Sequence, residues 1–79
     1  MALNVDYDRD ADALYVHLGD KPYSHGQDLD DERRIDYAAD GTPIGVELTC
    51  VSLGVDLTDL PRADEISGAL RQHDIRELA

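Results

Sequence analysis

The sequence has one cysteine, few basic residues and no long apolar run. Cys50 has no second cysteine with which to form an intrachain disulfide or to complete a zinc pair. This use of cysteine predicts a reducing, cytoplasmic setting. The first residues have neither the basic start nor the apolar run of a signal peptide, and no segment approaches membrane-spanning length. We therefore expect a protein that stays inside the cell and makes no contact with membranes.

Acidic residues outnumber basic residues by 18 to 7, which gives a formal net charge of -11. The resulting negative potential repels phosphate backbones and anionic lipids, so we expect no direct binding of nucleic acid. Two interpretations of the charge stay open. It serves solubility, or it attracts a basic protein partner.

The length of 79 residues favours one domain over residues 1–79. A chain of this size buries only about 60 to 65 % of its unfolded surface, so we expect modest stability. The periodicity of the apolar residues divides the chain into two parts. Residues 1–57 alternate as strands do and predict a β-sheet body, whereas residues 58–79 predict a helical C-terminal extension.

The segment from Arg34 to Leu48 predicts a β-hairpin. Apolar residues recur at every second position on both sides of Asp40 and Gly41, which predicts strands with one apolar and one polar face. Asp40 and Gly41 are typical of a tight primed turn, because glycine has no Cβ atom to oppose a positive φ and aspartate tolerates one. The apolar positions are Ile35, Tyr37, Ile44, Val46 and Leu48.

The N-terminal part predicts a second hairpin around an Asp-rich bend at residues 8–12. Residues 23–31 alternate weakly, so we expect an edge strand or an irregular connection there. The alternation changes phase after Cys50, which predicts a bulge or bend. The apolar positions of this second hairpin are Leu3, Val5, Tyr7, Leu14, Val16 and Leu18.

The C-terminal part predicts one helix. Thr58 and Asp59 followed by Pro61 match a helix start. An apolar stripe then recurs at helical spacing, and it either packs on the chain's own sheet or lies in a partner's groove. The whole pattern predicts an α+β fold, an antiparallel sheet of four or five strands built from hairpins with one C-terminal α-helix. The stripe consists of Ala63, Ile66 and Leu70.

Two groups of residues bear on metal binding. Four aspartates at positions 6, 8, 10 and 12 alternate like the start of a calcium loop, but Ala11 and His17 stand where such a loop needs glycine and glutamate. His17, His25 and His73 have a spacing that matches no closed zinc pattern. We therefore predict neither a metal nor a cofactor.

The polar face of the predicted sheet is the third group with possible chemistry. If both hairpins belong to one sheet, Tyr15 and His17 approach Asp36 and Glu47, and a histidine beside two carboxylates suits general acid–base catalysis. A small sheet offers little material for a catalytic pocket. The structural alternative is that these carboxylates, together with Asp12, satisfy backbone donors or pair with arginines.

Three short motifs occur in order along the first two thirds of the chain. They are Asp-Ala-Leu-Tyr at 12–15, Asp-Tyr at 36–37 and Gly-x-Glu at 45–47. Over about Val5 to Leu53 the chain resembles the small bacterial domain of unknown function 2283 family. The resemblance implies a mainly antiparallel sheet without an established activity, encoded beside small toxin genes, and thus an antitoxin-like role. The helical extension lies outside it. The family positions are Asp12, Asp36, Gly45 and Glu47.

We predict a protein-partner-binding module, antitoxin-like, that takes a basic protein as its partner. Ala63, Ile66 and Leu70 would form the contact. The first alternative is a small metal-dependent or acid–base enzyme that uses His17, Asp36 and Glu47. The second alternative is a purely structural homodimer. We expect a homodimer whichever of these functions holds, because one helix with a narrow stripe cannot cover the apolar face of the sheet.

Overall fold

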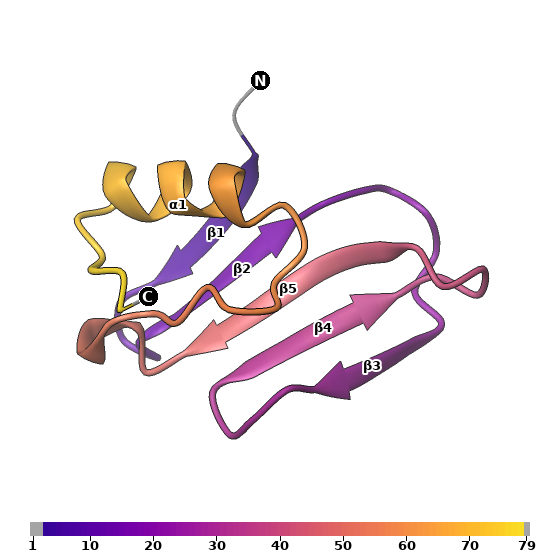
Figure 1. Cartoon of the computed structure of the whole chain (residues 1–79), viewed down its shortest axis with the longest axis horizontal. Helices are drawn as coiled ribbons and strands as arrows, with labels where there is room; N and C mark the ends of the chain where they lie inside the picture. Colours follow the sequence, from indigo (N-terminus) through magenta and orange to yellow (C-terminus); the bar gives the residue numbers. More distant parts are fainter. Residues whose placement is uncertain (1–2, 79) are drawn as a thin grey trace.

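The computed structural model describes residues 3–78, which form one five-stranded sheet with a single α-helix across one face (Figure 1). Neighbouring strands are all antiparallel, in the order β1-β2-β5-β4-β3. The predicted α+β class, with its sheet of four or five strands and its C-terminal helix, is confirmed. The elements are β1 (Asn4–Asp8), β2 (Ala13–His17), β3 (His25–Asp28), β4 (Arg33–Tyr37), β5 (Pro43–Thr49), the 3-10 helix η1 (Val51–Leu53) and α1 (Ala63–Gln72).

The hairpin β4–β5 forms as predicted, but its turn differs from the predicted one. Gly41 has φ 86°, whereas Asp40 does not have a positive φ. The Gly41 N–H donates to the Ala38 carbonyl at 3.0 Å, and the Ala38 N–H donates to the Thr42 carbonyl at 2.9 Å. This is the longer hairpin loop in which one left-handed glycine follows an ordinary turn. The predicted two-residue primed turn is therefore wrong.

Two further expectations about the strands are confirmed. The weakly alternating segment contains β3, which is the outermost strand beside β4. The change of phase after β5 occurs at Cys50, which has φ 54° and leads directly into η1. A left-handed residue breaks the extended conformation of a strand and so ends the alternation.

The predicted start of the helix is wrong. α1 begins at Ala63, and the preceding residue, Arg62, has φ 53° and forms no side-chain cap. The Thr58 N–H donates instead to the carboxylate of Asp56 at 2.9 Å, and Asp59 has φ 66°. The polar residues that resemble a helix cap therefore form a separate turn, which short side chains of this kind also favour.

The helix and the extended segments beside it cover the apolar face of the sheet together. Val55 and Leu60 precede α1, Ile75 follows it, and all three are buried against the strands. α1 alone does not cover this face, but the extended segments complete the cover, so an uncovered face no longer supports the homodimer, which stays a prediction. The most deeply buried side chains are Leu14, Val16, Val46, Leu48, Val51, Ile66 and Leu70.

The burial of α1 corrects the predicted partner contact. Ile66 and Leu70 have 0 % exposure and lie in the chain's own core, and Ala63 is half-buried. The alternative in which the stripe packs on its own sheet is the one the structure adopts. No helix among residues 3–78 is long and apolar enough to cross a membrane.

Candidate functional site

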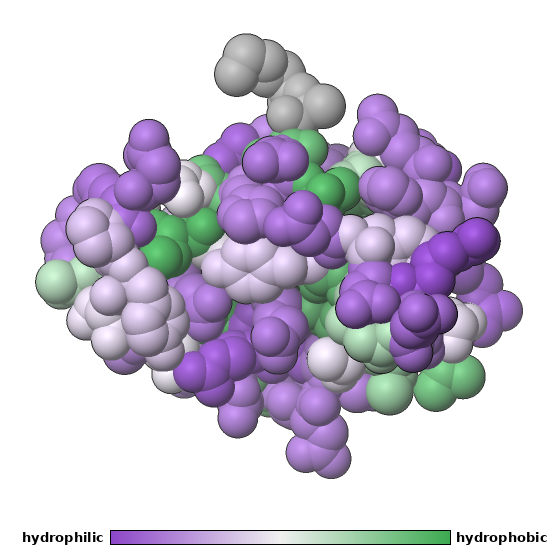
Figure 2. All heavy atoms as spheres, turned by 180° about the vertical axis from the view of Figure 1, so that it is seen from behind, coloured by the Kyte–Doolittle hydropathy of each residue, from purple (hydrophilic) through white to green (hydrophobic). Residues whose placement is uncertain are grey.

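The second face of the sheet has no helix across it, and we call it the open face (Figure 1). Seen from behind the view of Figure 1, the molecule presents a mostly hydrophilic surface (Figure 2). Strand register aligns the side chains of this face in two rows across the five strands. The first row is Asp6, Tyr15, Glu47, Arg34 and Asp28, and the second is Asn4, His17, Gly45, Asp36 and Gly26.

Tyr15 and Asp36 form the centre of the open face. The Tyr15 hydroxyl donates to Asp36 Oδ2 at 2.9 Å, and Arg34 Nε donates to Asp36 Oδ1 at 3.3 Å. Burial raises the pKa of Tyr15 to about 12, and the hydrogen bond and negative charge of Asp36 add to this effect. The predicted approach of Tyr15 to Asp36 is confirmed. So is the alternative in which this carboxylate pairs with an arginine.

Two glycines make this arrangement possible. Gly45 lies beneath the Tyr15 ring, where a Cβ atom would overlap the phenol oxygen. Gly26 lies beneath Arg34 in the same way, so that a Cβ atom there would overlap the guanidinium. Because glycine has no side chain, Tyr15 and Arg34 can each lie flat over the neighbouring strand.

His17 lies on the open face but has a different partner from the predicted ones. Its Nε2 atom is 2.7 Å from the Asp6 carboxylate, and its ring contacts Tyr15 edge-on at a centroid distance of 4.8 Å. In the sheet register, Gly45 separates His17 from Asp36. His17, Asp36 and Glu47 therefore share a face without forming one hydrogen-bonded group, an arrangement that does not favour acid–base catalysis.

Asp12 links the β1–β2 turn to η1, which directly follows β5. Its carboxylate accepts hydrogen bonds from the Ser52 N–H at 2.9 Å and from the Ser52 hydroxyl at 2.6 Å. Its carbonyl accepts one from the Val51 N–H at 3.2 Å. Asp12 has φ 54°, which aspartate tolerates better than most residues do. The structural interpretation of this family position is confirmed.

The Asp-rich bend is a capped turn. Asp8 Oδ1 accepts hydrogen bonds from the Asp10 N–H at 3.0 Å and the Ala11 N–H at 3.1 Å. These bonds replace backbone pairing at the end of β1. Within residues 3–78, no group of three or more histidine, cysteine or acidic side chains is arranged to hold a metal ion.

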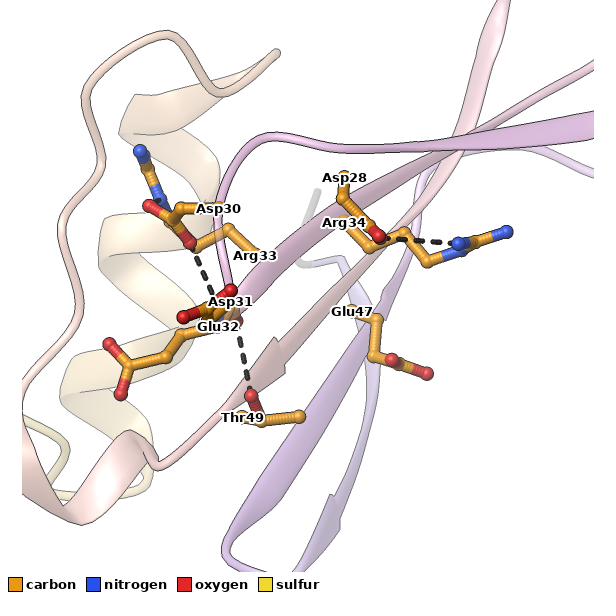
Figure 3. A pocket seen from close by; sticks show the side chains of 8 residues that line it. All are labelled: Asp28, Asp30, Asp31, Glu32, Arg33, Arg34, Glu47 and Thr49. Atoms are coloured by element: carbon orange, nitrogen blue, oxygen red, sulfur yellow. Dashed lines mark hydrogen bonds and ion pairs between the residues drawn. The ribbon is translucent and has the colours of Figure 1, made fainter.

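An acidic hollow of about 340 Å³ lies where β3 ends and β4 begins, on the side of the open face (Figure 3). Arg34 extends along the strands to Asp28, with Nη1 3.2 Å from its carboxylate. Arg33 turns to the opposite side of the sheet and donates to the carbonyls of Asp56 and Thr58 at 3.0 and 2.6 Å. The hollow is lined by Asp28, Asp30, Asp31, Glu32, Arg33, Arg34, Glu47 and Thr49.

A second hollow adjoins the first on the other side of the β3–β4 turn. It shares Asp30, Glu32, Arg33 and Thr49 with the first and is closed by Gly54, Asp56 and Leu78. We call the two hollows together the acidic end. From the sequence, residues 23–31 were expected only to form an edge strand or an irregular connection, and no site was predicted there. The site depends on the return of the chain at 54–56 and 78 to this end of the sheet, which no local pattern indicates.

The comparisons with known proteins agree with the motifs. Neither a curated protein nor a solved structure matches the chain. A family model matches residues 4–52, which span the five strands and most of η1 and contain Asp12, Asp36, Gly45 and Glu47. The match ends before α1, so the helical extension lies outside it. The chain therefore belongs to the family described as Protein of unknown function (DUF2283).

Proposed function

We propose that this protein is a partner-binding module, antitoxin-like, that binds a basic segment of another protein at its acidic end. The observation that carries the proposal is the pair of adjoining acidic hollows around the β3–β4 turn. Arg33 and Arg34 do not neutralise all of the carboxylates there. Among residues 3–78, the side-chain carboxylates of Asp31 and Glu47 accept no hydrogen bond and form no ion pair, so both remain available to a cation.

The affinity of such a complex requires apolar contacts in addition to charge. Complementary charge speeds the encounter and disfavours wrong partners, whereas buried apolar anchors supply most of the binding free energy. Leu53 and Leu78 are 65 % and 57 % exposed, and Leu78 packs against Gly54 beside the second hollow. These two leucines replace the helix stripe as the proposed anchors. The occupant is thus a segment with both basic and apolar side chains.

A second copy of the chain is the competing occupant of this surface. In a two-fold dimer the same patch faces itself, so the two acidic ends would repel each other. Charge therefore favours a basic partner over self-association here. The predicted homodimer is tested separately by light scattering at micromolar concentration, because a mass equal to that of one chain would exclude it.

The test uses a synthetic peptide of alternating lysine and leucine as a defined basic and apolar ligand. Amide chemical shifts of the labelled protein are recorded during titration at low and at high salt. We expect the largest shifts at residues 28–32, 47, 53–56 and 78, and weaker binding at high salt because exposed charges are screened.

Charge reversal provides the matched comparison. Glu47→Lys and Asp31→Lys should each weaken peptide binding by about three- to tenfold, since each places a like charge in the site. Asp20→Lys makes the same change of charge in an exposed loop that lines neither hollow, and it should bind as the unmodified protein does. Equal weakening in all three variants, or shifts spread evenly over the molecule, would refute a specific site.

A further inference from the structure

The basic residues of this acidic chain are not all paired with carboxylates. Four of the seven, Lys21, Arg33, Arg34 and Arg62, form ion pairs with aspartate or glutamate. Within the described residues the other three, Arg9, Arg71 and Arg76, form none. With 18 acidic side chains available, an arginine without a carboxylate partner is unexpected. Two of these three arginines, Arg9 and Arg76, line one groove.

The groove lies at the end of the molecule where the β1–β2 turn, η1 and the segment after α1 meet (Figure 1). Its volume is about 390 Å³, and we call it the arginine groove. Val51 and Ile75 line it as buried apolar side chains, so part of its surface is apolar. Tyr7 and His73 add a wall in which the two rings meet edge-on at a centroid distance of 5.4 Å.

The arginines in the groove are suited to an anion. Arg76 Nη2 donates to the Leu53 carbonyl at 3.3 Å, which holds the guanidinium near η1 and leaves its other N–H groups for a ligand. Arg9 extends from the β1–β2 turn with no ion pair to any residue of 3–78. The planar fork of a guanidinium matches the paired oxygens of a carboxylate or a phosphate, and an apolar floor strengthens such hydrogen bonds.

We propose that the arginine groove binds a small molecule through an oxyanion group, either a carboxylate or a phosphate. Asp74 also lines the groove and opposes the two arginines, so it weakens the binding of any anion. The overall charge of -11 acts in the same direction at long range. Among the residues that line the groove, the two arginines outnumber the one aspartate, whereas acidic residues predominate in the chain as a whole.

The test titrates the whole protein with inorganic phosphate and, separately, with acetate, at constant ionic strength maintained with chloride. Arginine Nε–H and amide chemical shifts are followed during each titration. We expect saturable shifts at Arg9, Ser52, His73 and Arg76 in at least one of the two titrations. The titration with the tighter binding tells whether phosphate or carboxylate is the preferred group.

Three variants make the test specific. Arg76→Gln and Arg9→Gln should each weaken binding by about five- to tenfold, because each removes a charged donor. Arg71→Gln removes the same charge from the last turn of α1, outside the groove, and should leave binding unchanged. Asp74→Asn should strengthen binding. Shifts no larger than those with chloride alone, or an equal loss in Arg71→Gln, would overturn the proposal.

Discussion

Gly45 lies directly beneath Tyr15, so that the tyrosine ring occupies the space in which any other residue would place its Cβ atom. The two residues come from the neighbouring strands β5 and β2. The contact directs the phenol across the sheet to Asp36 on β4, the strand on the other side of β5. A glycine in the middle of a strand is thus explained by a side chain far from it in sequence.

Replacement of Gly45 tests this relationship. Gly45→Ala should destabilise the fold by about 1 to 3 kcal/mol, because Tyr15 must leave its position to relieve the overlap. Urea unfolding measures the change. Gly19→Ala is the control, since a Cβ atom at Gly19 meets nothing within 4 Å. In a Tyr15→Ala background the cost of Gly45→Ala should shrink, and an unchanged cost would contradict the proposed contact.

The raised pKa of Tyr15 predicts a loss of stability in alkali. An ordinary tyrosine has a pKa of 10.0, whereas burial and Asp36 raise that of Tyr15 to about 12. Above the ordinary value, the unfolded chain releases a proton that the folded chain keeps, so this contribution is complete below pH 10 and is lost as the pH rises toward 12. The free energy of unfolding should therefore fall over this range.

Two variants separate Tyr15 from the other phenols. Tyr15→Phe should show a shallower fall in the free energy of unfolding across this alkaline range, because it lacks the perturbed group. Asp36→Asn should lower the pKa of Tyr15, since it removes the neighbouring negative charge. Ultraviolet absorbance of the tyrosinate measures the titration, and identical curves for Asp36→Asn and the unmodified protein would rule out this account.

Asp12 should contribute more stability than Asp10 in the same turn. Asp12→Ala should cost about 1 to 3 kcal/mol, because the Ser52 N–H loses its acceptor and alanine disfavours φ 54°. Asp12→Asn keeps an acceptor and tolerates the backbone, so it should cost less. Asp10→Ala is the control in the same turn, since the Asp10 side chain has no hydrogen-bond partner in the part of the chain described. Equal costs at the two positions would argue against the role of Asp12.

The helical extension should be part of the folding unit. Ile66→Ala should destabilise the whole chain by about 2 to 5 kcal/mol, because it leaves a cavity in the core between helix and sheet. The exposed Gln72→Ala on the same helix should change the free energy of unfolding by less than about 0.5 kcal/mol. Circular dichroism of helix and sheet during urea unfolding should show one transition. Loss of the helix signal before the sheet signal would contradict this prediction.

The sequence by itself determined the strands and the helical part. Alternation at every second residue specifies which side chains of β1, β2, β4 and β5 face the core, because a slip of one residue would expose them all. The stripe of Ala63, Ile66 and Leu70 indicated a helix for the same reason of periodicity. The three motifs at 12–15, 36–37 and 45–47 together indicated the family, which the match over residues 4–52 confirms.

Tertiary structure decided which of these residues meet and where the elements end. Local capping signals at Thr58 and Asp59 suit a turn as well as a helix, so only packing against the sheet places the start of α1 at Ala63. The acidic end and the arginine groove each join segments from distant parts of the chain, and no local pattern encodes such a meeting. Gly45 shows the general reason. Its role depends on the strand order, which pairs β5 with both β2 and β4.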